Sequence, residues 1–169
     1  MDNFRIDSER CMNGLILLGN RQMEVRTFLK PKPGPGQATV KLKASGLCGS
    51  DLPHYRSSTK AMKDQNSLIV GHEACGVIDE VGQGLRRVQV GDRVMIHPYT
   101  GCGNCKHCRA SWTQLCLKGP KISGSHIHGA DADYELVNEY MCVLMPEGLG
   151  FEEGAACACG TGTAYQALK

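Results

Sequence analysis

Four closely spaced cysteines, Cys102, Cys105, Cys108 and Cys116, constrain this chain most strongly, and their gaps are two, two and seven residues. Two-residue gaps let successive thiolates converge on one point, and the longer gap lets the chain return and close a tetrahedron. Four sulfur ligands with no open position are typical of a structural zinc site. The spacing therefore predicts a zinc-binding segment, residues 98–121, which we call the cysteine lobe.

Two other interpretations of the lobe are open. A disulfide framework would fit ten cysteines in 169 residues, but the apolar run Leu15–Leu18 is too short for a signal peptide or a membrane span. A ferredoxin-type iron–sulfur cluster also uses two-residue gaps, but its fourth cysteine is closer and is followed by proline, whereas Leu117 follows here. A reducing compartment with metal-bound thiolates is the better account, so we expect a cytoplasmic protein.

The composition describes a folded domain with an almost neutral surface. The chain is 41% apolar and 21% charged, which is sufficient for a hydrophobic core. The net charge is +2 with scattered lysines and arginines, so we expect no nucleic-acid partner and no anionic membrane partner.

The sequence predicts short strands, separated by glycine and proline, over most of the chain. Residues Ala38–Ala44 alternate, with Val40 and Leu42 on one face and polar side chains on the other. Further strands are expected at Gly14–Gly19, Met23–Leu29, Ala74–Val81, Asp92–His97 and Tyr134–Leu144. A helix is expected only at Phe151–Lys169. This pattern predicts a mainly β fold, a small barrel or sandwich.

A second group of candidate ligands lies outside the lobe, in three separate segments. Cys48 follows the alternating strand, His72 lies between Gly71 and Glu73, and Cys159 lies far downstream. Each is weak evidence alone, because a lone cysteine is usually a buried apolar residue. Together they offer the Cys₂His ligand set of a catalytic zinc that keeps one position open.

The order of these motifs resembles the zinc-dependent medium-chain alcohol and polyol dehydrogenases. The resemblance rests on Gly46-Leu-Cys48-Gly-Ser-Asp51, Gly71-His-Glu73, Gly91-Asp-Arg-Val94, the cysteine lobe, Asp133-Tyr134 and Cys159-Gly160. It implies a GroES-like, partly open β-barrel over residues 1–150, which carries the lobe. Residues 151–169 would then begin the helical connection to a dinucleotide-binding domain.

The resemblance also implies a role for each matching residue. Cys48, His72 and Cys159 would hold the catalytic zinc, and Cys102, Cys105, Cys108 and Cys116 would hold the structural zinc, which makes two zinc ions per chain. Glu73 would approach the catalytic metal, Ser50 would accept the proton of the substrate hydroxyl, Asp51 would orient the ligand histidine, and Thr163 would face the nicotinamide.

The implied reaction is hydride transfer between a small alcohol or polyol and NAD or NADP. Zinc would stabilise the substrate alkoxide, and the reverse reaction would reduce a carbonyl. A homo-oligomer is compatible with the resemblance. The non-enzymatic alternative is a stand-alone zinc-binding module without redox activity.

The chain departs from the family pattern at two positions. The family often has a relay histidine five residues after the first ligand cysteine, where this chain has Pro53, followed by His54. Proline cannot relay protons, so either His54 or water replaces the relay, or the relay is missing. Cys157 lies two residues before Cys159 and would face another direction in a helix, which favours Cys159 as the ligand.

A dinucleotide-binding fingerprint is not found in this sequence. The G-x-G-x-x-G turn that follows a strand in Rossmann domains has no counterpart, because Cys159-Gly-Thr-Gly162 lies within the expected helix. The chain stops inside that helix. We therefore expect either the isolated catalytic domain of a longer enzyme or a naturally truncated reading frame, and in both cases a chain that transfers no hydride alone.

Overall fold

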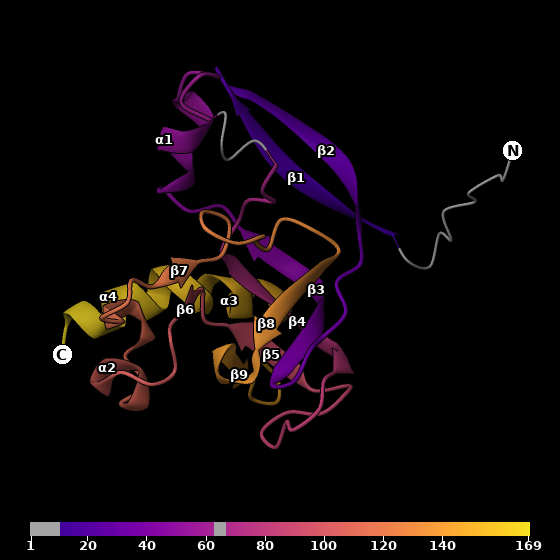
Figure 1. The fold of residues 1–169 in the computed structure, drawn as a ribbon, viewed down its shortest axis with the longest axis vertical. Helices are drawn as coiled ribbons and strands as arrows, with labels where there is room; N and C mark the ends of the chain where they lie inside the picture. Colours follow the sequence, from indigo (N-terminus) through magenta and orange to yellow (C-terminus); the bar gives the residue numbers. More distant parts are fainter. Residues whose placement is uncertain (1–10, 63–66) are drawn as a thin grey trace, which may run out of the picture.

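The computed structural model describes residues 11–62 and 67–169, and its centre is a five-stranded antiparallel sheet (Figure 1). The strand order is β8-β3-β4-β5-β9. The strands are β3 (Gln37–Gly46), β4 (Glu73–Val81), β5 (Arg93–Ile96), β8 (Tyr134–Asn138) and β9 (Cys142–Leu144). The prediction of a mainly β fold is confirmed.

Two smaller sheets flank this centre. The hairpin of β1 (Cys11–Gly19) and β2 (Gln22–Leu29) extends away from it, beside the short helix α1 (Asp51–Arg56). It turns through Asn20 and Arg21, which both have positive φ. Such a two-residue turn matches the twist of the flanking strands. β6 (Tyr99–Thr100) pairs with β7 (Lys121–Ile122) and so joins the two ends of the cysteine lobe.

The core forms where the alternating strands turn their apolar faces inward. Val40 of β3 is fully buried and Leu42 packs against the same cluster, as the alternation predicts. The buried members of this cluster are Ala38, Val40, Ala74, Ile78, Val88, Val94, Ile96, Ala130, Val137, Met141 and Cys142. All five strands contribute to this cluster, and Val88, Ala130 and Met141 add to it from segments between strands. The central sheet is therefore a stable platform for the segments at its ends.

One expected strand is divided in the structure. The sequence predicts a single strand over Tyr134–Leu144, but the short 3₁₀ turn η3 (Glu139–Met141) separates β8 from β9. The Glu139 carboxylate accepts the N–H groups of Arg86 and Arg87, both at 2.5 Å, and this holds the turn in place. The turn is needed because β8 and β9 lie at opposite edges of the sheet.

The helices are short, and the expected C-terminal helix has an irregular middle. It consists of α3 (Phe151–Ala156), the π-helical turn η4 (Cys157–Thr161) and α4 (Gly162–Ala167). The sequence did not predict α1 (Asp51–Arg56), α2 (Lys106–Arg109) or the 3₁₀ turn η2 (Thr113–Leu115). They have six, four and three residues, too few to show helical periodicity. Among the described residues, no helix has the length and apolarity to cross a membrane.

Candidate metal centres

The antiparallel pairing of β3 and β4 brings the first three candidate ligands together. Gly46, at the end of β3, pairs with Glu73, at the start of β4. Cys48 lies two residues beyond the end of β3, and His72 lies one residue before β4. Residues more than twenty positions apart in the sequence therefore meet at one end of the central sheet.

The fourth candidate ligand comes from the C-terminal helix. α3 packs against β3 and β4, and the Cys75 thiol donates a hydrogen bond to the Phe151 carbonyl at 2.8 Å. The π-helical turn η4 then carries Cys159 toward the ends of the two strands. Single π-turns inside helices are frequent at functional sites, because they change which side chains face a neighbouring element.

The ligand atoms of Cys48, His72, Glu73 and Cys159 all lie within 4.8 Å of one another. We call these four residues the open cluster. Cys157, the other candidate in the helix, is not among them. The four residues come from three separate segments of the chain, so their convergence is a property of the tertiary fold.

A glycine directly before His72 is required by the backbone. Gly71 has a φ of +88°, which is a left-handed conformation that side chains disfavour. A Cβ atom there would also lie only 2.3 Å from Oδ1 of Asp131. The close approach of Asp131 to Gly71 thus depends on glycine, and Asp131 is itself held by the Ser45 hydroxyl at 2.6 Å.

Two side chains contact the imidazole ring of His72. Oδ1 of Asp51 lies 3.5 Å from Nδ1 of His72, and Oδ2 of Asp51 accepts the Cys48 N–H at 2.8 Å. On the other side of the ring, the Ser50 hydroxyl lies 3.4 Å from Nε2. Asp51 therefore positions two members of the open cluster at once, and it directs Nε2 of the histidine toward Ser50.

The groups of the open cluster disfavour one another's ionisation, and a bound cation would remove that conflict. Burial, with a smaller contribution from the neighbouring Cys48 and Glu73, raises the pKa of the Cys159 thiol to about 11. Glu73 is buried, with 8% of its surface exposed. Two thiols, one imidazole and one carboxylate suit zinc, which binds sulfur, nitrogen and oxygen ligands.

The cysteine lobe forms the second convergence of ligand atoms. The four sulfur atoms of Cys102, Cys105, Cys108 and Cys116 lie within 4.8 Å of one another. A tetrahedral zinc with four sulfurs at 2.3 Å separates them by about 3.8 Å, so the lobe fits this metal. All ten cysteines of the chain are unpaired, which argues against the disulfide framework.

Backbone amides in the lobe stabilise thiolates. The Cys102 N–H donates to Sγ of Cys116 at 3.3 Å, and the Cys108 N–H donates to Sγ of Cys105 at 3.5 Å. Hydrogen bonds from the backbone of Cys108 and Leu117 lower the pKa of the Cys105 thiol to about 6. A thiolate is the form that binds metal, so the lobe backbone is arranged for coordination.

A cavity of about 620 Å³ adjoins the open cluster on the side of the C-terminal helix. Cys159 and Thr163 line it from the helix, and His97 lines it from the segment after β5. The Thr163 hydroxyl also interacts with the Cys159 thiol. Nε2 of His97 lies 3.1 Å from the Thr113 hydroxyl in the lobe. This cavity therefore connects the open cluster, the helix and the lobe.

His54 is the one predicted site residue that the structure does not bring into these contacts. It lies on α1, one helical turn after Asp51, and it is not among the ligand residues of either cluster. Sequence reasoning missed two acidic residues, Asp131 beside Gly71 and Glu135 on β8. Asp131 is half-buried and Glu135 is buried, and burial raises the pKa of both carboxyl groups.

Comparisons of the sequence with family models and with known proteins agree on one family. Residues 34–147 match the family model for the alcohol dehydrogenase GroES-like domain. An uncharacterized zinc-type alcohol dehydrogenase-like protein of Escherichia coli (strain K12) is 37% identical over 166 residues, which is 94% of this chain and 47% of that protein. Sorbitol dehydrogenase of Arabidopsis thaliana is 34% identical over 83% of this chain and 39% of its own length.

Solved structures agree with this result. A thermostable alcohol dehydrogenase from Pyrobaculum aerophilum with bound cobalt and zinc superposes with a TM-score of 0.77 at 28% identity. The superposition covers 92% of this chain and 47% of that chain. This chain thus spans less than half the length of the relatives it matches.

Proposed function

The chain belongs to the alcohol dehydrogenase GroES-like domain family, and we propose that it is the catalytic domain of a zinc-dependent alcohol or polyol dehydrogenase that uses NAD or NADP. The observation that carries this proposal is the convergence of Cys48, His72, Glu73 and Cys159 within 4.8 Å. A purely structural role would need only the cysteine lobe, and the open cluster would then have no purpose.

In this proposal Cys48, His72 and Cys159 hold a catalytic zinc, and Glu73 is close enough to approach it. When bound, zinc supplies a Lewis acid for the oxygen of an alcohol or carbonyl group. The four cysteines of the lobe hold a second, structural zinc, which makes two per chain. The cobalt and zinc in the Pyrobaculum aerophilum enzyme support a metal-dependent assignment.

The side chains around the open cluster position the substrate and move its proton. We assign to Ser50 the acceptance of the substrate hydroxyl proton, because its hydroxyl faces the cluster beside Nε2 of His72. Asp51 holds the His72 ring in its orientation, as partners of ligand histidines commonly do. His54, one turn further along α1, is our candidate for passing the proton to solvent in place of the histidine that Pro53 replaces.

The nicotinamide cofactor would approach from the cavity beside the C-terminal helix, where Thr163 lies next to Cys159. The described residues form no parallel sheet of the dinucleotide-binding kind, so we propose that residues 1–169 alone transfer no hydride. We place residues 1–150 in the catalytic domain and residues 151–169 in the connection to a cofactor domain.

We further propose a cytoplasmic location, because all ten cysteines are unpaired. We also propose that the complete enzyme forms a homo-oligomer.

Cobalt(II) substitution tests the proposal without the cofactor domain. Cobalt bound to thiolates absorbs visible light, and an open site changes its spectrum when a small ligand binds. We expect added imidazole, and then 2-propanol and sorbitol, to change the spectrum of the cobalt-loaded chain. The Cys159→Ala variant should lose this response, and the Cys157→Ala variant should keep it.

The contrary result would favour a zinc-binding module without redox activity. A cobalt spectrum that none of these ligands changes, and that is the same in wild type and Cys159→Ala, would show that only the lobe binds metal. The open cluster would then not form a metal site, and the proposed enzymatic function would be wrong.

A further inference from the structure

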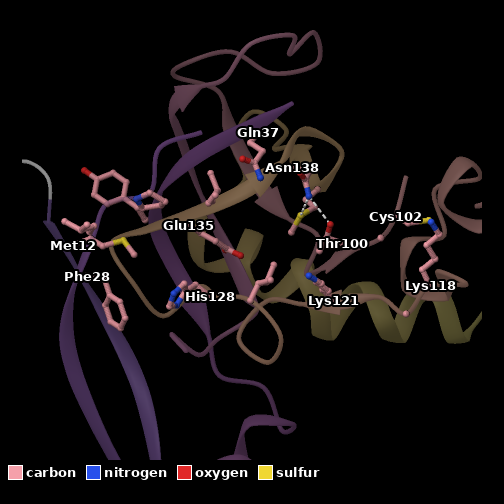
Figure 2. Close-up of a pocket in the computed structure, with 18 residues that line it drawn as sticks. Met12, Phe28, Gln37, Thr100, Cys102, Lys118, Lys121, His128, Glu135 and Asn138 are labelled. Atoms are coloured by element: carbon pink, nitrogen blue, oxygen red, sulfur yellow. Dashed lines mark hydrogen bonds between the residues drawn. The ribbon is translucent and has the colours of Figure 1, made fainter. Parts of the chain in front are cut away.

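A second cavity of about 770 Å³ has no part in the function proposed above. No residue of the open cluster lines it. Its walls come from the β1–β2 hairpin, from β8 and from the two ends of the cysteine lobe (Figure 2). The volume falls within the range of small-molecule sites in proteins, about 300–1,000 Å³.

Glu135 lies in the wall of this cavity, between Phe28 and His128 on one side and Thr100 and Lys121 on the other (Figure 2). The residue is 2% exposed. Its Oε1 atom accepts a hydrogen bond from the Ser123 hydroxyl at 2.7 Å. Its Oε2 atom is buried and has no hydrogen-bond partner in the described structure. An unpaired buried carboxyl oxygen is costly, and the ionised form of Glu135 would need a hydrogen-bond donor at this atom.

The other charged and polar groups around Glu135 leave this need unmet. Asp131 is close enough for its charge to disfavour ionisation of Glu135. Lys118 and Lys121 line the cavity from the lobe, but both residues are exposed. His128 accepts the Ile69 N–H through Nδ1 at 3.2 Å, and burial lowers its pKa, so its ring brings no positive charge to Glu135.

The rest of the wall is largely apolar and includes an aromatic ring. Met12 and Phe28 line the cavity from the hairpin, and Leu136 and Met141 line it from the segment of β8 and η3. The Phe28 ring meets the His128 ring edge-on, with centroids 5.4 Å apart. One water occupies about 30 Å³ in the liquid, so this cavity is too large and too apolar to exist only for a water bound to Glu135.

We propose that this cavity is a second small-molecule site and that it binds an amphipathic primary amine. The ammonium group donates to Oε2 of Glu135, and the apolar part lies against Met12, Phe28 and Met141. An ammonium group suits the position better than a hydroxyl, because it supplies both the missing donor and a positive charge beside two acidic residues.

Methionine methyl groups offer direct reporters for the test. Met12 and Met141 line the proposed site, whereas Met95 lines the cavity beside the open cluster. The zinc-loaded chain, labelled with ¹³C at the methionine methyl groups, is titrated by NMR with benzylamine. Benzyl alcohol is the matched neutral probe. The variants are Glu135→Gln, which keeps the shape of the side chain, and Glu147→Gln, an exposed control.

We expect benzylamine to shift the signals of Met12 and Met141 more than that of Met95. Its affinity should fall about tenfold or more in Glu135→Gln, since a charge-assisted hydrogen bond is lost, and stay unchanged in Glu147→Gln. Benzyl alcohol should bind wild type about tenfold more weakly than benzylamine. Phe28→Ala, which keeps Glu135, should weaken benzylamine binding several-fold and serves as the second variant if Glu135→Gln does not fold.

Three results would overturn the proposal. They are the absence of shifts at Met12 and Met141 with benzylamine, equal affinity of wild type and Glu135→Gln, and equal affinity for benzylamine and benzyl alcohol. None of them bears on metal binding by the open cluster, so failure here is distinguishable from failure of the proposed enzymatic function.

Discussion

Oδ1 of Asp51 lies 3.5 Å from Nδ1 of His72, and the second oxygen of the same carboxylate accepts the Cys48 N–H at 2.8 Å. One side chain thus connects two segments that are far apart in the sequence and that each contribute a candidate metal ligand. Asp51 lies at the start of α1, the short helix that the sequence did not predict. The order of the open cluster therefore depends on this helix.

Replacement of Asp51 by asparagine should weaken metal binding at the open cluster. The amide carries no charge to hold His72, and substitution of such partners typically costs 10–100-fold in metal affinity. Competition with a zinc chelator measures the change. Asp92→Asn is the matched control, because the Asp92 carboxylate also accepts a backbone N–H, from Gln89 at 2.9 Å. A wild-type affinity in Asp51→Asn would show that Asp51 does not support a metal ligand.

Cys102→Ser should release the lobe metal and unfold the lobe, while the central sheet stays folded. Structural zinc contributes directly to local folding, whereas the sheet has its own hydrophobic core. Limited trypsin digestion followed by mass spectrometry should show rapid cleavage after Lys106 and Arg109. Cys11→Ser, in the hairpin, is the control and should resist cleavage. Equal resistance of both variants would mean that the lobe folds without its metal.

Glu135 should make the chain less stable as the pH rises through neutrality. Burial raises the pKa of its carboxyl group to about 7 from the ordinary value of 4.5. The folded state then holds a proton that the unfolded state has already lost between these values, so the free energy of unfolding falls as pH rises through this window.

Comparison of Glu135→Gln with wild type isolates this contribution. The glutamine cannot ionise, so its advantage over wild type should grow by about 1 kcal/mol between about pH 6 and about pH 8. Urea unfolding at both pH values measures the difference, and effects of pH on metal binding are common to both proteins. Glu147→Gln should follow wild type. A constant difference between Glu135→Gln and wild type would contradict the raised pKa.

Gly76→Ala should destabilise the central sheet. A Cβ atom at position 76 would lie 2.2 Å from the Lys41 carbonyl oxygen in the neighbouring strand, and such overpacking typically costs about 1–3 kcal/mol. Thermal unfolding measures the loss. Gly160→Ala is the control, because nothing lies within 4 Å of its added Cβ and alanine favours helix. Equal stability of the two variants would contradict the tight pairing of β3 and β4.

The sequence predicted β3 and both groups of ligands for different physical reasons. The alternation of Val40 and Leu42 is a local signal of a half-buried strand, and the structure confirms it. The lobe was visible because its four cysteines lie within one short segment. Cys48, His72 and Cys159 belong to distant segments, so residue spacing alone gives no distance between them. Only the order of the motifs, through the family resemblance, suggested that they meet.

Other features depend on tertiary contacts that no local pattern contains. The turn between β8 and β9 is held by hydrogen bonds from Arg86 and Arg87 to Glu139, across more than fifty residues. The charge of Glu135 would predict a solvent-facing side chain, but the residue lies on the same strand face as the buried Val137. That alternation was the one signal that could have indicated its burial.

The zinc content of wild type and Cys159→Ala tests the central claim most directly. Elemental analysis of metal-replete protein should give about two zinc ions per chain for wild type and about one for Cys159→Ala, since the lobe keeps its metal. Cys157→Ala is the matched control in the same π-helical turn and should keep about two. A content of about one in wild type, unchanged in Cys159→Ala, would contradict the account, because the open cluster would then bind no metal.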